Sequence, residues 1–84
     1  MTAEPSAASA EAGDSEHSYL QQLGARVRDA RTRLGLSRKA LAGKSGVSER
    51  YLAQLEGGQG NISILLLRQV AAALDCPLTE LLGE

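Results

Sequence analysis

The sequence is poor in the residues that build large cores, disulfides and metal sites. Its 84 residues include no Trp, no Phe, two Tyr, one Cys and one His. One cysteine excludes an internal disulfide, and we expect Cys76 to fill a small buried apolar position. His17 lacks the Cys or carboxylate neighbours that would indicate a metal site. The core must therefore be aliphatic, and we expect neither a metal nor a cofactor.

The sequence also lacks long apolar runs and catalytic motifs. No stretch approaches the roughly 18 apolar residues of a membrane span, and no signal-peptide core follows the start, so we expect a cytosolic protein. The loop GGQGN at 57–61 contains three glycines but no phosphate-binding G-x-x-x-x-G-K-[ST] pattern. His17, Tyr19 and Tyr51 form no recognisable catalytic group. We therefore predict that the protein is not an enzyme.

Charge is distributed unevenly along the chain. The net charge is −1, yet all nine Lys and Arg residues lie between Arg26 and Arg68. That span holds only three acids, Asp29, Glu49 and Glu56, and so carries +6, while seven acids lie in the flanks. A basic middle between acidic ends is the asymmetry that a DNA-binding face shows, although a solvated surface can have the same composition.

The chain divides into a tail and one small domain. Residues 1–17 contain no Leu, Ile, Val, Phe or Trp, so we predict a disordered tail, and we assign residues 18–84 to the domain. A first helix is expected from Ser18, which has capping-box spacing to Gln21, to Leu34, with Gly35 ending it. Its apolar positions recur at three- and four-residue steps. They are Leu20, Leu23, Val27, Ala30 and Leu34.

Residues 37–56 have the pattern of two short helices joined by a tight turn. Ser37 and Ser48 are placed to cap them, because a serine oxygen can accept a hydrogen bond from an unpaired helix amide. Gly46 ends the first helix, and Val47 fills the turn. The second helix leaves a short polar row outward that can read base edges. Its inward positions are Leu52 and Leu55, its boundary position is Tyr51, and its outward positions are Glu49, Arg50, Ala53 and Gln54.

Two further helices are predicted after the motif. Gly57 or Gly58 ends the motif, and the glycine-rich loop can bring Asn61 to a DNA phosphate. Ser63 caps a helix expected over 64–74, and Pro77 opens a short fifth helix. The inward positions are Ile64, Leu67, Val70, Ala71 and Leu74, followed by Leu78, Leu81 and Leu82.

Leu65 and Leu66 do not fit an amphipathic helix, which would expose at least one of them. Two interpretations remain open. They make extra core contacts, or they form an interface with a second subunit or with a missing effector domain.

These patterns resemble the Cro/C1-type (XRE, phage-repressor-like) helix-turn-helix family over residues 23–82. LSRKALAGKSGVSERYLAQLEGG at 36–58 matches the motif, LGARVRDARTRLGLS at 23–37 the first helix, and ISILLLRQVAAALDCPLTELL at 62–82 the fourth and fifth helices. The resemblance implies an all-α, compact five-helix lambda-repressor-like domain with the motif at 37–56. It also implies binding of double-stranded DNA through the second helix of the motif.

The same resemblance implies roles for particular residues. The base-reading positions of the family fall on Glu49, Arg50 and Gln54, with Ser48 and Tyr51 at the rim. Each reader has suitable chemistry, since Arg can pair with guanine, Gln with adenine, and Glu can accept from a cytosine amine. Glu49 also lies in the first turn of its helix, where a negative charge is favourable without any base contact.

Contacts to the DNA backbone and one internal ion pair are also implied. The family often has Gln where this chain has Arg38, and an arginine there can still reach a phosphate. Ser37, Lys39 and Lys44 are further backbone candidates. In the family, the residues that match Arg31 and Glu56 form a structural salt bridge, so neither is expected to contact DNA.

The run LEGGQGNISILLLRQVAAALDCPLTELL is similar to the first domain of the benzoyl-CoA-responsive repressors, which carry a shikimate-kinase-like domain after it. That similarity implies a repressor of an aromatic-acid catabolic operon with benzoyl-CoA as effector, and that these 84 residues are part of a longer protein. The favoured function is a sequence-specific repressor that binds a two-fold operator as a homodimer. The alternative is a protein-interaction module, of antitoxin or coactivator type, that acts through the helix at 64–74.

Overall fold

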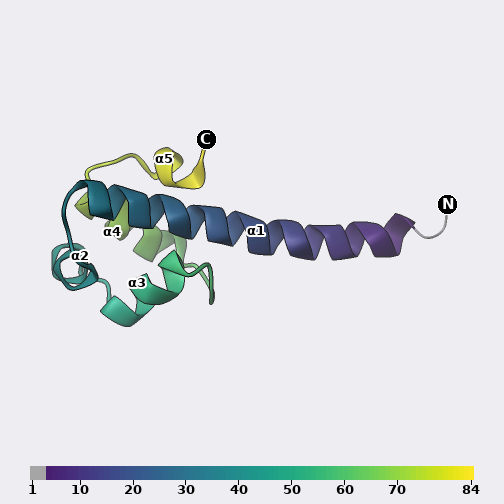
Figure 1. Cartoon of the computed structure of the whole chain (residues 1–84), viewed down its shortest axis with the longest axis horizontal. Helices are drawn as coiled ribbons and strands as arrows, with labels where there is room; N and C mark the ends of the chain where they lie inside the picture. Colours follow the sequence, from purple (N-terminus) through teal and green to yellow (C-terminus); the bar gives the residue numbers. More distant parts are fainter. Residues whose placement is uncertain (1–3) are drawn as a thin grey trace.

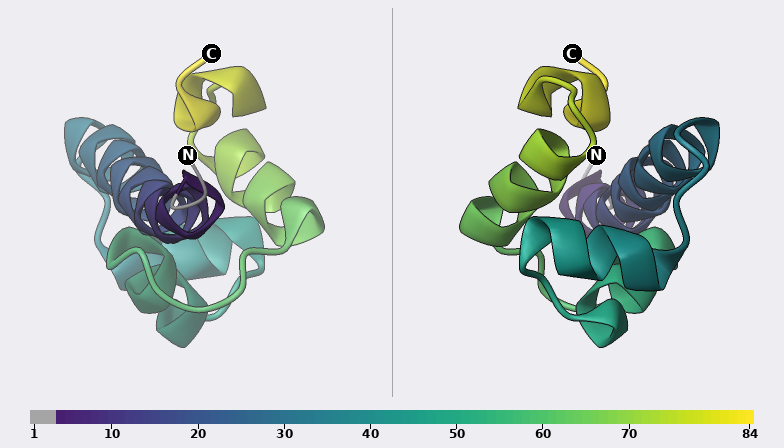
Figure 2. Two further views of the ribbon diagram at one scale, coloured as in Figure 1. Left: turned by 90° about the vertical axis from the view of Figure 1, so that its right-hand side faces the viewer. Right: turned by 90° about the vertical axis from the view of Figure 1, so that its left-hand side faces the viewer.

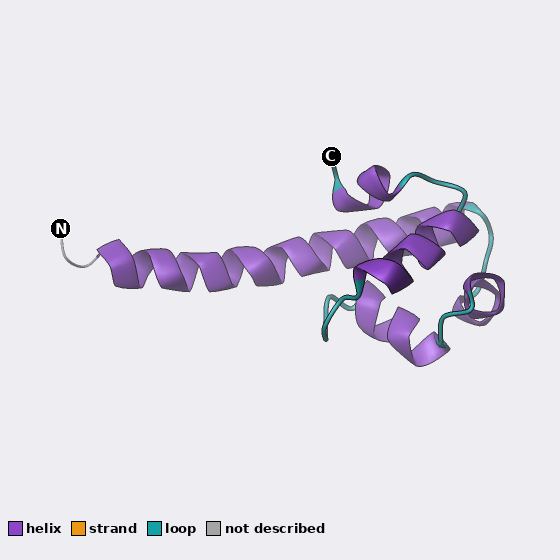
Figure 3. Ribbon diagram, turned by 180° about the vertical axis from the view of Figure 1, so that it is seen from behind, coloured by secondary structure: helices purple, strands orange, loops and turns teal. Residues whose placement is uncertain are grey.

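The computed structural model describes residues 4–84, and the side chains of residues 16–84. The five helices are α1 (Glu4–Arg33), α2 (Arg38–Ser45), α3 (Glu49–Glu56), α4 (Ile64–Ala73) and α5 (Leu78–Leu82). No strand occurs in residues 4–84, as Figure 3 also shows. Within residues 4–84, no helix is long and apolar enough to cross a membrane. The predicted all-α, five-helix fold is confirmed.

Helix α1 begins earlier than predicted. It starts at Glu4 instead of Ser18, so Ser18 lies within the helix and does not cap it; its Oγ accepts a 3.5 Å hydrogen bond from Gln22 Nε2. Ala and Glu, which are frequent before Ser18, are good helix formers and continue the helix. Of the predicted tail, residues 1–3 lie outside the described residues. The helical part before Ser18 projects away from the other four helices, as expected for a segment without large apolar residues (Figure 1).

The second half of α1 packs against two of the other helices. It contacts α3 on one side and α5 on the other, while α2 packs on α3 and α4 (Figure 2). Tyr19 and Arg26 of α1 also reach the backbone carbonyls of Leu82 and Leu81, at 3.4 and 3.5 Å. The core is aliphatic, as predicted. It consists of Leu23, Val27, Ala30, Leu41, Val47, Leu52, Leu55, Leu67, Val70, Ala71, Ala73, Leu74 and Leu81.

Two predicted core positions are exposed, and a third, Leu20, lines a shallow hollow instead of joining the core. Leu34 is 48% exposed, because it follows the last residue of α1 where the chain turns, and Leu36 packs against the core instead. Ile64 is 55% exposed at the first position of α4, and Ile62 of the preceding loop packs against the core in its place. Both errors arise at helix ends, where the helical period no longer decides which side chain faces inward.

Leu65 and Leu66 have different environments. Leu66 is half-buried and packs against the core, whereas Leu65 is 65% exposed. The adjacent Ile64 adds to this exposed apolar surface at the start of α4. The core interpretation therefore describes Leu66, and only Leu65 is free for an interface. Cys76 is half-buried against the core, and burial together with the nearby Glu80 raises the pKa of its thiol.

Helix α1 approaches the end of α3 very closely at Gly24, a residue to which no sequence pattern gave a role. A Cβ at Gly24 would lie 2.3 Å from the carbonyl oxygen of Leu55 and 2.7 Å from that of Glu56. Real Cβ atoms do not approach backbone oxygens this closely, so any larger residue forces the two helices apart. Gly24 therefore sets the depth at which α3 sits against α1.

We predict that Gly24→Ala destabilises the domain by about 1–3 kcal/mol, because overpacking displaces backbone. Gly43→Ala is the matched control, since Gly43 lies in α2 and no atom beyond its chain neighbours and its own helix backbone lies within 4 Å of the place that an added methyl group would take. That variant should be up to about 1 kcal/mol more stable than the wild type. Urea unfolding followed by circular dichroism measures both, and equal stabilities of the two variants would show that Gly24 is not a close contact.

Candidate nucleic-acid interface

The turn between α2 and α3 is built from local capping interactions. Ser37 Oγ accepts a hydrogen bond from the Ala40 amide, and Ser48 Oγ accepts one from the Tyr51 amide, both at 3.0 Å. Gly46 ends α2 with φ of 76°, a left-handed conformation that glycine adopts without the steric cost of a side chain. The turn and both predicted caps are therefore present.

Helix α3 separates a buried face from an exposed one. Leu52 and Leu55 are fully buried, which anchors the helix to the core. Glu49, Arg50 and Gln54, the three predicted base readers, are all exposed, as is Ala53. The inner face alone holds the helix, so the outer side chains are free to contact another molecule.

Tyr51 is partly withdrawn from this exposed row. Its ring packs against the core, and its hydroxyl is buried without a hydrogen-bond partner in the described part of the chain. Burial raises the pKa of Tyr51, and the nearby backbone of Ser63 opposes this only in part. The hydroxyl is therefore a neutral group near the start of α4, and the ring of Tyr51 belongs to the packed side of the helix.

The end of α3 is fixed by a buried ion pair. Arg31 Nε and Nη2 donate to the two carboxylate oxygens of Glu56, at 2.7 and 3.0 Å. The side chains are 11% and 1% exposed, respectively. Arg31 Nη1 also donates to the carbonyl of Leu36 at 2.8 Å. The pair implied by the family resemblance is present, and it joins α1, the α1–α2 turn and α3.

Arg38 is a second partner of Glu56, which no sequence pattern indicated. Its Nε donates to Glu56 Oε1 at 3.1 Å, while its side chain stays 45% exposed. The cluster of Arg31, Arg38 and Glu56 therefore carries a net positive charge. Arg38, which the sequence predicts to contact a DNA phosphate, is thus also hydrogen-bonded to the end of α3.

The two arginines set the ionisation of Glu56. Burial alone would raise the pKa of this carboxyl, but hydrogen bonds from Arg31 and then Arg38, with their charges, hold it below its ordinary value. Because the folded-state pKa is lowered, the pair stabilises the fold fully at pH values above the unfolded-state pKa of this carboxyl. This contribution is lost as the pH falls through the folded-state pKa.

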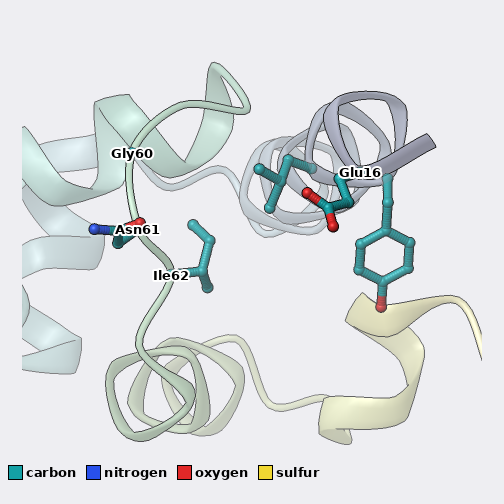
Figure 4. A pocket seen from close by; sticks show the side chains of 6 residues that line it. Glu16, Gly60, Asn61 and Ile62 are labelled. Atoms are coloured by element: carbon teal, nitrogen blue, oxygen red, sulfur yellow. The ribbon is translucent and has the colours of Figure 1, made fainter. Parts of the chain in front are cut away.

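The remaining backbone candidates lie on exposed surface. Lys39 and Lys44 are exposed on α2, and Asn61 is exposed in the loop after α3. Asn61 borders a shallow hollow of about 450 Å³ whose other walls include Glu16, Tyr19 and Ile62. In Figure 4 its side chain points away from Glu16 and Ile62, out of that hollow. Among the described residues, no group of three His, Cys, Asp or Glu residues is placed to hold a metal ion.

Comparison with known proteins places this geometry in a family. The profile of the HTH_3 family, described as helix-turn-helix, matches residues 27–81. The chain belongs to the HTH_3 helix-turn-helix family. This confirms the Cro/C1-type resemblance.

Curated HTH-type transcriptional regulators are similar to the chain. The transcriptional regulator SlrR of Bacillus subtilis is 43% identical over 60 residues, which cover 70% of this chain and 40% of SlrR. The regulator SinR of Bacillus licheniformis is 40% identical over 63 residues, 74% of this chain and 57% of SinR. The chain thus spans about half the length of these curated relatives. They are named as regulators rather than enzymes, which agrees with the predicted lack of enzyme activity.

Solved structures of HTH regulators share the fold. The restriction-modification controller protein C.AhdI from Aeromonas hydrophila has a TM-score of 0.71 and 40% identity, and the match covers 74% of this chain and 94% of that one. The structure of SinR, a master regulator for biofilm formation, in complex with DNA has a TM-score of 0.67 and 39% identity, and the match covers 71% and 97% of the two chains.

We predict that Glu56→Ala lowers the free energy of unfolding by about 3–5 kcal/mol, because it leaves Arg31 buried without its counter-charge. Any DNA affinity should fall with it, since α3 loses its anchor. Asp29→Ala is the matched control: it removes the 3.1 Å pair with Arg33, whose side chains are both more than 60% exposed. Breaking that exposed pair should cost less than about 1 kcal/mol.

Thermal unfolding and DNA titration of the Glu56 variant must be read together. A variant with wild-type stability that loses only DNA affinity would make Glu56 a contact residue instead of a structural one.

Proposed function

We propose that this chain is the DNA-binding domain of a sequence-specific transcriptional regulator that reads the major groove with α3. The main observation behind this proposal is the exposed row of Glu49, Arg50 and Gln54 on a helix whose opposite face is fully buried. The similarity to SinR, whose structure was solved in complex with DNA, supports this function. Such a protein acts where DNA is accessible, so we keep the cytosolic location in the proposal.

The chemistry of the exposed row fits base recognition. A major groove about 12 Å wide admits a helix, and each base pair presents its own pattern of donors and acceptors there. In our proposal Arg50 pairs with guanine and Gln54 with adenine, and Glu49 accepts from a cytosine amine. Gln54 lies near the loop, since its Oε1 would be 3.4 Å from a Cβ at Gly60. Its contacts are therefore expected at the loop end of the row.

Backbone contacts would position the reading helix. We assign them to Arg38, Lys39 and Lys44 of α2, together with Ser37 and Asn61, and place Ser48 and Tyr51 at the rim. Ser37 Oγ is occupied as the cap of α2, so Ser37 would contribute through its position at the helix start. These contacts lie within the span of charge +6, and they would supply affinity without sequence preference.

Two copies on a two-fold operator are the second part of the proposal. Ile64 and Leu65 are exposed side by side at the start of α4. Beside Leu65 lies a shallow hollow of about 390 Å³, lined also by Arg68, Gln69 and Ala72. This surface is small for a stable dimer, and the chain spans about half the length of its curated relatives. We therefore propose that most of the dimerisation, and any effector site, lies in a further domain.

The exposed Leu65 is the observation that favours the alternative function. A protein-interaction module acting through α4 would use Leu65, and the outer row of α3 would contact no DNA. A module of that kind has little reason to present Arg50 and Gln54 outward within a basic span, so we favour DNA binding. The finer prediction of an aromatic-acid operon with benzoyl-CoA as effector stays a prediction, because none of the relatives described above is named for it.

Selection of bound duplexes from a random DNA pool tests the proposed function. Recovery of a defined motif with two-fold symmetry is the expected result. Recovery of unenriched sequence, together with retention of a partner protein that depends on Leu65, would favour the interaction module.

We predict that Arg50→Ala relaxes discrimination at one base pair, at a cost of about 1–3 kcal/mol on the selected duplex. Arg38→Ala should instead lower the affinity for selected and scrambled duplexes alike. It should also reduce the slope of the logarithm of affinity against the logarithm of salt concentration by about one. Fluorescence-anisotropy titrations at several salt concentrations measure both effects. If Arg50→Ala weakened both duplexes equally, its assignment as a base reader would be wrong.

We also predict that these 84 residues bind one operator half weakly and that tight binding requires two linked copies. One reading helix reaches a few base pairs, whereas two copies about 34–36 Å apart make the second contact effectively intramolecular. Analytical ultracentrifugation at micromolar concentration without DNA should find monomers. A tight dimer would show that the domains pair by themselves. It would refute the proposal that a further domain supplies most of the dimerisation.

A further inference from the structure

Glu56 is already satisfied by one of its two arginines. Arg31 donates to both carboxylate oxygens, at 2.7 and 3.0 Å, and uses its third nitrogen on the Leu36 carbonyl. Every nitrogen of the Arg31 guanidinium is thus engaged, and each Glu56 oxygen has a donor. The bond from Arg38 Nε to Oε1 adds a third donor to a carboxylate that is already neutralised.

The arrangement of Arg38 is therefore not required for burying Glu56. Its side chain is 45% exposed, and only its Nε has a hydrogen bond within the described part of the chain. A guanidinium is planar and rigid, so a bond at Nε fixes the direction of its two Nη groups. Arg38 is the first residue of α2, the end of a helix at which backbone amides and their dipoles favour an anion.

We propose that Glu56 is a positioning residue for Arg38, holding it as a pre-oriented clamp for a DNA phosphate. This inference rests on the proposed function and adds to it a link between the two helices. One carboxylate at the end of α3 then fixes both the reading helix and the backbone contact at the start of α2. The orientation of Arg38 is set before DNA arrives, so less side-chain freedom is lost on binding.

The proposal separates arginine from lysine at this position. A lysine carries the same charge but has a single nitrogen, which cannot occupy Glu56 and a phosphate with a fixed geometry. A cation that acts only through its charge would be replaced by lysine without loss. A cation that acts through its orientation would not.

The anchor can be tested in the free protein. Nitrogen-15 NMR should find that the Arg38 Nε–H exchanges with water more slowly than the Nε–H of Arg28, an exposed arginine of α1. Equal exchange rates would show that Glu56 does not hold Arg38 in solution, and the proposal would fall.

The consequence for DNA is tested with Arg38→Lys, with Arg28→Lys as the matched control. Arg38→Lys should weaken selected and scrambled duplexes alike by about three- to tenfold, the scale of ordering one long side chain. Its salt slope should stay unchanged because the charge is kept. Its melting temperature should remain near the wild type, because Arg31 still pairs with Glu56. Arg28→Lys should change neither affinity nor salt slope.

The outcomes distinguish this inference from the function on which it rests. Wild-type affinity of Arg38→Lys would refute the clamp, even if Arg50→Ala still lost its preference for the selected duplex. A loss confined to the selected duplex would make Arg38 a base reader and would also refute the clamp. If the wild type itself did not prefer the selected duplex, the proposed function would fail, while the exchange experiment would still decide whether the anchor exists.

Discussion

The buried carboxylate of Glu56 is the interaction on which the arrangement of the motif depends. It is the last residue of α3, where the helix dipole disfavours a negative charge, and its side chain is 1% exposed. Such a charge is tolerated only when it is paired and hydrogen-bonded. Arg31 of α1 and Arg38 of α2 satisfy this requirement. Three helices are therefore joined at one point, beside the surface that faces outward.

Close packing near that point completes the placement of α3. Gly24 lets the backbone of α1 approach the carbonyls of Leu55 and Glu56, and the side chains of Leu52 and Leu55 are fully buried in the core. A domain this small and without Trp or Phe depends on such short distances, because its apolar area is limited. The ion pair fixes the direction of the end of α3, and the contact at Gly24 fixes how closely α3 approaches α1.

The scaffold and the contact surface use different residues of the same short helix. The core uses Leu52, Leu55 and the ring of Tyr51 from α3, and neither Glu49, Arg50 nor Gln54 contributes to it. The outer row can therefore change between members of the family with little effect on stability. Arg38 is the exception, since its Nε is bound to Glu56 while its side chain stays 45% exposed. In our proposal it links the scaffold to the DNA-contacting surface.

Local signals in the sequence were sufficient for the turn, the outward row and the number of helices, but not for the start of α1. Serine caps, the glycine at the end of α2 and the three-to-four spacing of leucines act within a few residues, so their effect can be followed along the chain. Arg31 and Glu56, 25 residues apart, were paired only through the family resemblance. Tertiary structure alone decided the close approach at Gly24, the replacement of Ile64 by Ile62 and the second partner of Glu56. These depend on residues that are distant in sequence and meet only after the helices have packed. The sequence by itself thus determined the motif and its exposed polar row, and the packing of α1, α2 and α3 decided how that row is held.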